Sequence, residues 1–342
     1  MFGFRKGLVA SAVVAVSICT GASTSLASSS WEFSEDSVNL GINAVSPHVE
    51  RTNGNDRVWY PGLPSTAVVD CNEAGSCTPV AGVGRLGTDF TAVTLPNGTR
   101  RAYFVEMVQG AGTKTVVSAA CTTAECLSVG PSTPIAADVA VSTNERAWGV
   151  PDAVVTPDGK VRVYLVVSPV LTSSCPEKVR SYISNDGITF TQESGYRLEG
   201  GYVDTEVIRA KAGDWLMMTS TGPGCGNGMQ QLFITSSTDG LVWSTPQQLT
   251  KADKRRLDPT AYEVSPNVFR VYYSTADSRM TETYTLRRGT LKIGTGSSAS
   301  ASATAKLGAA CTKAGAKASV TIAKKKTTIT CRLVKKKLVW SK

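Results

Sequence analysis

A hairpin pattern is clearest in residues 152–165, Asp152-Ala153-Val154-Val155-Thr156-Pro157-Asp158-Gly159-Lys160-Val161-Arg162-Val163-Tyr164-Leu165. Two runs rich in β-branched residues flank a Pro-Asp-Gly turn, which is typical of a β-hairpin. An apolar run, a turn and a run with Arg or aromatic residues recur in this order five times in the 342 residues. The turns hold Gly54, Gly98, Gly159, Gly213 and Asn267, at separations of 44, 61, 54 and 54 residues.

Two further strand-like runs follow each hairpin, for example at 179–183 and 189–193. Four strands in a repeat of about 50 residues are typical of a β-propeller blade, and five such units fill residues 31–293. The last unit shows only three strands, so we expect run 31–40 to supply its fourth and close the ring. The sequence therefore predicts an all-β, five-bladed β-propeller. A β-sandwich is the alternative, but it does not predict so regular a repeat.

The third and fourth strands of two units are linked by Ser184-Asn185-Asp186-Gly187-Ile188-Thr189-Phe190 and by Ser237-Thr238-Asp239-Gly240-Leu241-Val242-Trp243. These links resemble the Asp-box of sialidase-type propellers. We expect each Asp to accept turn N–H bonds, each Gly to take a positive φ and each aromatic to pack between blades. Asp186 and Asp239 are therefore interpreted as structural residues on the face opposite the pocket.

With the run at 181–201, the stretch 151–160 resembles exported sialidase-like propellers and five-bladed glycoside hydrolases of the arabinanase and fructan-hydrolase type. The resemblance covers about residues 40–293. It implies a carbohydrate-active propeller, most often a glycoside hydrolase, that requires no cofactor. Because a fold does not confer function, the alternative is a non-catalytic glycan-binding or cell-wall surface protein.

Five acids lie at equivalent places before the turns. Asp89, Asp204 and Asp258 stand nine residues before the turn residue, and Asp152 and Glu206 stand seven before it. Positions two apart share one side of a strand, so we expect these carboxylates to meet around the propeller axis, where crowding raises pKa values. The alternative is that they bond loop N–H groups between blades.

The resemblance implies three acids from successive blades. Asp89 is then the base or nucleophile, Asp152 orients and tunes, and Glu206 protonates the leaving oxygen. The family's base usually lies in the first blade, which here offers Pro47-His48, so a shift by one blade is needed. Some members hold an axial ion with a His from that position, which makes His48 a candidate ligand of an axial calcium ion.

Five further residues complete the candidate site as side chains that bind substrate. They are Asp204, Asp258, Trp148, Tyr202 and Arg51.

An Arg recurs three residues after four of the turns and is interpreted as structural: Arg57, Arg101, Arg162 and Arg270. This interpretation disfavours a sialidase, which needs three convergent Arg side chains.

Charge is divided unevenly along the chain. The net charge is +9, yet residues 306–342 alone carry +11, so the remainder is −2. A mildly acidic domain with a basic tail does not describe a nucleic-acid-binding surface. Residues 294–305 are rich in Gly, Ser and Ala and are interpreted as a flexible linker. We expect the tail, 306–342, to be a small Cys-paired β module that attaches to anionic wall polymers; the alternative is a solubilising tail.

The N-terminal 27 residues have the features of a secretory signal: Arg5 and Lys6, an apolar core and small residues at the cleavage site. We therefore expect an exported, monomeric protein, soluble or wall-associated, with oxidised cysteines. Short spacings pair Cys71 with Cys77 and Cys121 with Cys126. Cys311 and Cys331 stand alone in the tail, and elimination then leaves Cys175 with Cys225. Metal binding by these pairs is the weaker alternative, because the spacings differ from the usual two-residue gap.

Overall fold

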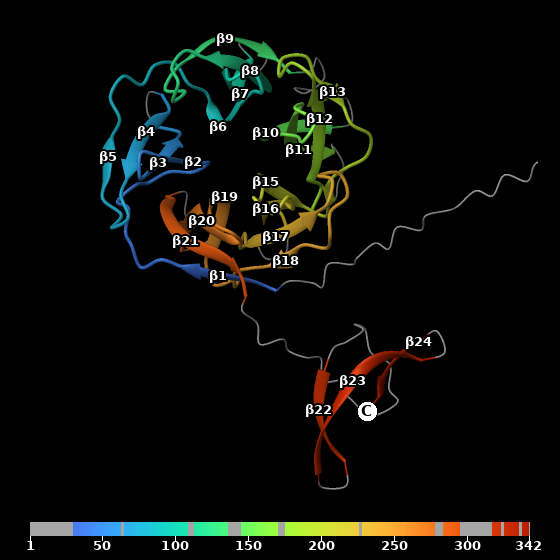
Figure 1. Ribbon diagram of the computed structural model, residues 1–342. Helices are drawn as coiled ribbons and strands as arrows, with labels where there is room; N and C mark the ends of the chain where they lie inside the picture. Colours follow the sequence, from blue (N-terminus) through green and yellow to red (C-terminus); the bar gives the residue numbers. More distant parts are fainter. Residues whose placement is uncertain are drawn as a thin grey trace, which may run out of the picture.

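The computed structural model describes residues 30–62, 65–108, 113–135, 145–169, 175–225, 228–277, 283–294, 317–322, 325–334 and 337–341. Within these ranges, 21 strands form five antiparallel sheets set as blades around one axis (Figure 1). This confirms the five-bladed propeller. Blade 1 holds β2 (His48–Thr52), β3 (Asn55–Tyr60), β4 (Ala67–Cys71) and β5 (Cys77–Pro79). Blade 2 holds β6 (Thr88–Thr94), β7 (Arg100–Val108), β8 (Thr113–Cys121) and β9 (Val129–Pro134).

The other three blades continue the same up-and-down order. Blade 3 adds a short fifth strand, which pairs with its third. It holds β10 (Glu145–Val155), β11 (Val161–Pro169), β12 (Lys178–Ser184), β13 (Thr191–Gln192) and β14 (Leu198–Glu199). Blade 4 holds β15 (Tyr202–Arg209), β16 (Trp215–Thr221), β17 (Leu232–Ser237) and β18 (Gln247–Gln248). Blade 5 holds β19 (Arg255–Ser265), β20 (Val268–Ala276), β21 (Thr285–Ile293) and β1 (Trp31–Glu35).

The ring closes through β1, as the sequence predicts. This strand pairs antiparallel with β21, from Trp31 opposite Ile293 to Glu35 opposite Gly289. A Cβ at Gly289 would lie 2.7 Å from the Phe33 ring, so a glycine is needed for this close approach. The pairing removes the free edge that the last blade would otherwise expose.

The apolar core lies between blades. One cluster joins Tyr103 and Val116 of blade 2 to Val163 and Leu165 of blade 3, and each of these side chains is buried. Inward-facing residues alternate with outward-facing ones along each strand, so both faces of a blade pack on neighbours.

The turns of blades 3 and 4 behave as the Asp-Gly pattern predicts. The Asp186 carboxylate accepts the N–H groups of Ile188 and Thr189, at 2.8 and 2.9 Å. Gly187 has a φ of 73°, and Phe190 packs edge-on against Tyr103 of the preceding blade. The Tyr103 hydroxyl donates to the Gly187 carbonyl at 2.9 Å, so each turn is fastened to the blade before it.

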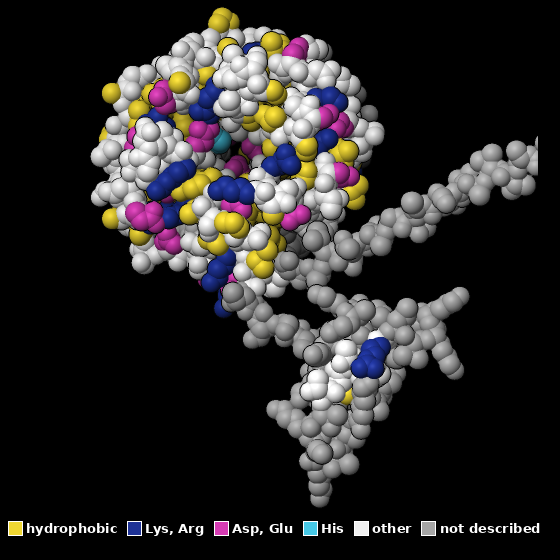
Figure 2. All heavy atoms as spheres, in the orientation of Figure 1, with side chains coloured by type: hydrophobic (Ala, Val, Ile, Leu, Met, Phe, Trp, Pro, Cys, Tyr) yellow, Lys and Arg dark blue, Asp and Glu magenta, His cyan; other side chains and the backbone are white. Residues whose placement is uncertain are grey.

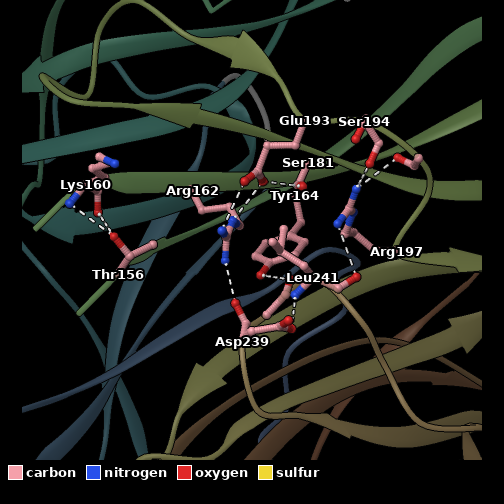
Figure 3. Close-up of polar contacts among 12 residues, drawn as sticks. Thr156, Lys160, Arg162, Tyr164, Ser181, Glu193, Ser194, Arg197, Asp239 and Leu241 are labelled. Carbon is pink, nitrogen blue, oxygen red and sulfur yellow. Dashed lines mark hydrogen bonds and ion pairs between the residues drawn. The ribbon is translucent and has the colours of Figure 1, made fainter. Parts of the chain in front are cut away.

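Figure 3 shows the same fastening between blades 3 and 4. The Tyr164 hydroxyl donates to the Gly240 carbonyl at 2.8 Å. Arg162 makes two hydrogen bonds to Glu193 within its blade and donates a third to the Asp239 carbonyl. The structural role predicted for the recurrent arginines is thus confirmed at Arg162.

Three of the expected disulfides are present: Cys71–Cys77, Cys121–Cys126 and Cys175–Cys225. The tail forms a three-stranded sheet of β22 (Lys317–Ile322), β23 (Lys325–Val334) and β24 (Lys337–Ser341). The predicted signal, nearly all of the linker and Cys311 lie outside the described residues. No helix among the described residues has the length and apolarity to cross a membrane.

Candidate functional site

The first strands of all five blades begin around one axial cavity. Figure 2 shows acidic side chains gathered around the hollow at the centre of the ring. The cavity measures about 30 Å³, which is about the volume of one water molecule in the liquid. Its lining includes the five predicted acids Asp89, Asp152, Asp204, Glu206 and Asp258.

Five equivalent residues form what we call the first ring. All have a left-handed backbone, with φ between 46° and 55°: Ser46, Asp89, Val150, Asp204 and Asp258. In blades 2 to 5 each sits in a register shift between the first two strands, which is the geometry of a β-bulge. The bulges explain why Asp predominates here, since Asp tolerates this conformation better than most residues do.

First-ring carboxylates bond to the next blade. Asp258 accepts the Ser46 N–H at 2.9 Å, and Asp89 accepts the Val150 N–H at 3.3 Å. Asp204 accepts a longer bond, 3.4 Å, from the Asp258 N–H. Each of these carboxylates therefore helps to hold the ring together.

Two residues further along lies the second ring: His48, Thr91, Asp152, Glu206 and Thr260. Asp152 accepts the Val207 N–H at 2.6 Å and the Thr91 hydroxyl at 3.0 Å. Glu206 accepts the Ala261 N–H at 3.1 Å. The inter-blade bonding left open by the sequence is therefore present, and the same side chains also line the cavity.

Burial changes the proton affinity of four of these acids. Burial raises the pKa of Asp152 and of Asp204 to about 6. The hydrogen bonds that these carboxylates accept lower the pKa, but by less than burial raises it. The pKa of Glu206 is raised well above its usual value by burial and by the nearby Asp152 charge. Burial and the Asp204 charge raise the pKa of Asp258 in the same way. The axis therefore holds four carboxyl groups that bind a proton more tightly than ordinary Asp and Glu side chains do.

A larger cavity, of about 400 Å³, lies further along the same strands. Asp152 and Glu206 line both cavities, together with His48 and Thr91. Asp152 and Glu206 thus contribute to the lining of two neighbouring spaces along the first strands, although both side chains are buried.

His48 is held by its neighbours. Its ring lies 5.5 Å from Trp59 and 5.6 Å from Phe90, and Nε2 is 3.3 Å from Glu50 Oε1. Within the described ranges, no group of three or more His, Cys, Asp or Glu side chains is arranged to hold a metal ion. The axial calcium site stays a prediction, and no step below depends on it.

Two of the remaining candidates, Arg51 and Tyr202, do not line the axial cavity. Arg51 pairs with Asp56 at 2.6 Å near the far end of its strand. Tyr202 packs edge-on against Phe233, with ring centres 5.4 Å apart. Trp148 lies in β10, but its side chain is outside the described residues.

Sequence reasoning missed the four ring members that are neither acids nor His48, namely Ser46, Val150, Thr91 and Thr260. Counting nine residues back from Gly159 reaches Val150, so this member could have been found by the same rule. The count fails by one residue at Ser46, because the turn of blade 1 is shorter. Thr91 and Thr260 stand seven residues before Gly98 and Asn267, as Asp152 and Glu206 do before their turns, so the same count reaches them. They were missed because neither is an acid, and the register confirms their equivalence.

No protein-family model matches the chain, and no curated protein matches it. Several solved structures share its fold. A thermostable family-43 glycoside hydrolase aligns with a TM-score of 0.54 and 14% identity, over 74% of this chain and 91% of that one. An endo-arabinase from Bacteroides thetaiotaomicron aligns with a TM-score of 0.53 and 9% identity, over 75% and 96%. The GH43_1 enzyme from Xanthomonas citri, complexed with xylotriose, aligns with 0.52 and 13%, over 74% and 89%. At these identities the likeness shows the fold alone.

Proposed function

We propose that this protein is a carbohydrate-active propeller, and specifically a glycoside hydrolase that acts through its axial carboxyl groups. The observation that carries the proposal is the Asp152–Glu206 pair. Both side chains face the axial cavities, and burial and mutual repulsion keep Glu206 protonated at a higher pH than an ordinary Glu. Glycoside hydrolysis needs a protonated carboxyl as acid beside an ionised one.

The proposed roles follow from these environments. Glu206 donates its proton to the leaving glycosidic oxygen. Asp152 remains beside it as the charge that raises its pKa. Asp89 is less buried than either and lines the same cavity, so it is the proposed base or nucleophile.

A second candidate function has its own support. The cavity of about 30 Å³ is far smaller than the ~300–1,000 Å³ of usual ligand pockets. Its acids also accept N–H bonds between blades. Both observations fit a propeller whose axis is structural and whose surfaces bind glycans without cleaving them.

Hydrolysis of arabinan, xylan, fructan and sialoside substrates separates the two candidates. We expect wild-type protein to release sugar from one of them. Glu206→Gln and Asp89→Asn should lower kcat by about a hundredfold or more, as the loss of general acid or base catalysis does. Asp158→Asn changes an exposed turn residue and is the matched control. Release of no sugar, or equal rates in the two axial variants and the wild type, favours the binding protein.

We further propose that the protein is exported, acts as a monomer and attaches to anionic wall polymers through its tail. The support is the charge division: residues 306–342 carry +11 and contain no acid. A basic module of this kind binds a polyanion by screened electrostatic attraction.

A further inference from the structure

An apolar groove of about 590 Å³ lies between blades 4 and 5. Its walls include Leu216 and Trp243 from blade 4 and Trp31, Asn267 and Ile293 from blade 5. The turns that border it belong to the same face as the Asp-Gly turns, away from the start of the first strands. β18 and β1 run side by side at its edge (Figure 1), where Gln247 donates to and accepts from the Trp31 backbone.

The groove exists because of the way the ring closes. In blades 3 and 4, the turn before the fourth strand packs on the preceding blade and accepts a tyrosine hydroxyl. Blade 5 has no such turn, since its fourth strand is β1, from the other end of the chain. Among the described residues, nothing fills the space beside blade 4 that such a turn would occupy.

The second strand of blade 4 is adapted to this open space. The position filled by Arg57, Arg101, Arg162 and Arg270 in the other blades is Leu216 here, by register with the first strand. Leu216 lines the groove. In blade 3 the equivalent Arg162 donates to the Asp239 carbonyl in the turn of the next blade. Leu216 cannot make such a bond and instead gives the groove an apolar wall.

The turn of blade 4 also presents more apolar surface to the groove than the turn of blade 3 presents at the equivalent place. Phe190 of blade 3 is buried, whereas the equivalent Trp243 is only half-buried and lines the groove. Thr189 of blade 3 corresponds to Val242, which is 75% exposed and also lines the groove. Trp243 packs edge-on against Tyr164, as Phe190 does against Tyr103, but part of its indole stays exposed in the groove. Together with Val242 it adds apolar surface that the described part of the fold does not cover, which is typical of a binding site.

The polar groups of the groove are uncharged, with one exception. Thr238, Thr245 and Asn267 contribute hydroxyl and amide groups, and Asp214 is the single ionisable side chain among the described lining residues. No Lys or Arg is among them. Two half-buried indoles with hydroxyl and amide groups around them suit a ligand that has apolar ring faces and hydroxyl edges.

We propose that this groove binds a neutral saccharide chain, at a site separate from the axial cavity. The proposal depends on the groove and not on hydrolysis at the axis, so either can fail without the other. A proline-rich peptide would also use indoles, but it carries few hydroxyl groups for the Ser- and Thr-rich wall to match.

Titration calorimetry of the full chain with xylohexaose and arabinohexaose tests the proposal. We expect one of these neutral oligosaccharides to bind, and Trp243→Ala to weaken the Kd by about tenfold or more, as loss of a central aromatic anchor does. Thr245→Arg places a long side chain at an exposed position of the groove and should weaken binding similarly without removing core contacts. Tyr196→Ala, which removes a half-buried aromatic outside the groove, is the matched control and should bind as the wild type does.

Three outcomes overturn the proposal. The first is that neither oligosaccharide binds, including the case in which a proline-rich peptide does. The second is that Trp243→Ala and Thr245→Arg both keep the wild-type Kd. The third is that binding persists in Thr245→Arg but is lost in Glu206→Gln, which would place the saccharide at the axis alone.

Discussion

The change Asp152→Asn should flatten the pH dependence of folding stability. Asp152 is buried, and its pKa is raised from 3.8 to about 6. The folded protein therefore keeps a proton that the unfolded chain has already released between about pH 4 and 6. Asp152 therefore contributes most to the free energy of unfolding at acidic pH, and this contribution is lost as the pH rises through about 6.

The magnitude is about 3 kcal/mol, because the pKa difference is about two units and each unit is worth about 1.4 kcal/mol. Asparagine should preserve the contacts. Its carbonyl can accept the Val207 N–H, and its amide can donate to the Thr91 hydroxyl that now donates to Asp152. The change then removes the titration while keeping the inter-blade bonds.

Urea unfolding at about pH 4, 6 and 8, followed by circular dichroism, gives the free energy of unfolding at each pH. Between about pH 4 and 8 the variant should lose about 3 kcal/mol less stability than the wild type does. Asp158→Asn is the matched control, since the pKa of Asp158 is lowered to about 2 and its carboxylate stays ionised throughout. Equal pH dependence in Asp152→Asn and wild type would refute the argument that burial raises the pKa of this carboxyl.

Three further predictions concern the fold and the tail. Tyr164→Phe should lower the free energy of unfolding by about 1–2 kcal/mol, measured in urea, because the buried Gly240 carbonyl loses its donor. Replacing Cys175 and Cys225 together by Ser should cost about 3–4 kcal/mol in the same assay, since the bond closes a loop across two blades. Deleting residues 306–342 should abolish salt-sensitive cosedimentation with teichoic-acid-bearing walls and leave the propeller's melting temperature unchanged; equal binding by both chains would contradict the attachment role.

The fold could be predicted because its determinants are local and repeated. Each hairpin carries its own turn residue, as Gly159 does between Val155 and Val161, and five copies define five blades. The closing strand followed from counting, since a last blade with three strands needs a fourth. Disulfides within hairpins followed from spacings of five and six residues.

The site could be predicted only in part. Spacing predicted that Asp89 and Asp152 meet around one axis, and the structure has them in two successive rings there. What spacing could not supply is the partner of each carboxylate, because the Val207 N–H that Asp152 accepts belongs to another repeat. The groove beside Leu216 depends on a turn that one blade lacks, and a missing turn leaves no positive signal in a sequence.

The most direct test is a crystal structure of Glu206→Gln with an oligosaccharide of the best substrate. We expect a sugar at the axis, with a glycosidic oxygen about 3 Å from the side chain of residue 206 and Asp89 facing the same sugar. We also expect the protein backbone around the narrow axial cavity to move apart so that this sugar can enter. Hydrolysis by the axial acids would be contradicted if the sugar were bound elsewhere and the axis were empty. In that case the axis would still be closed by the bonds from Asp152 to Val207 and from residue 206 to Ala261.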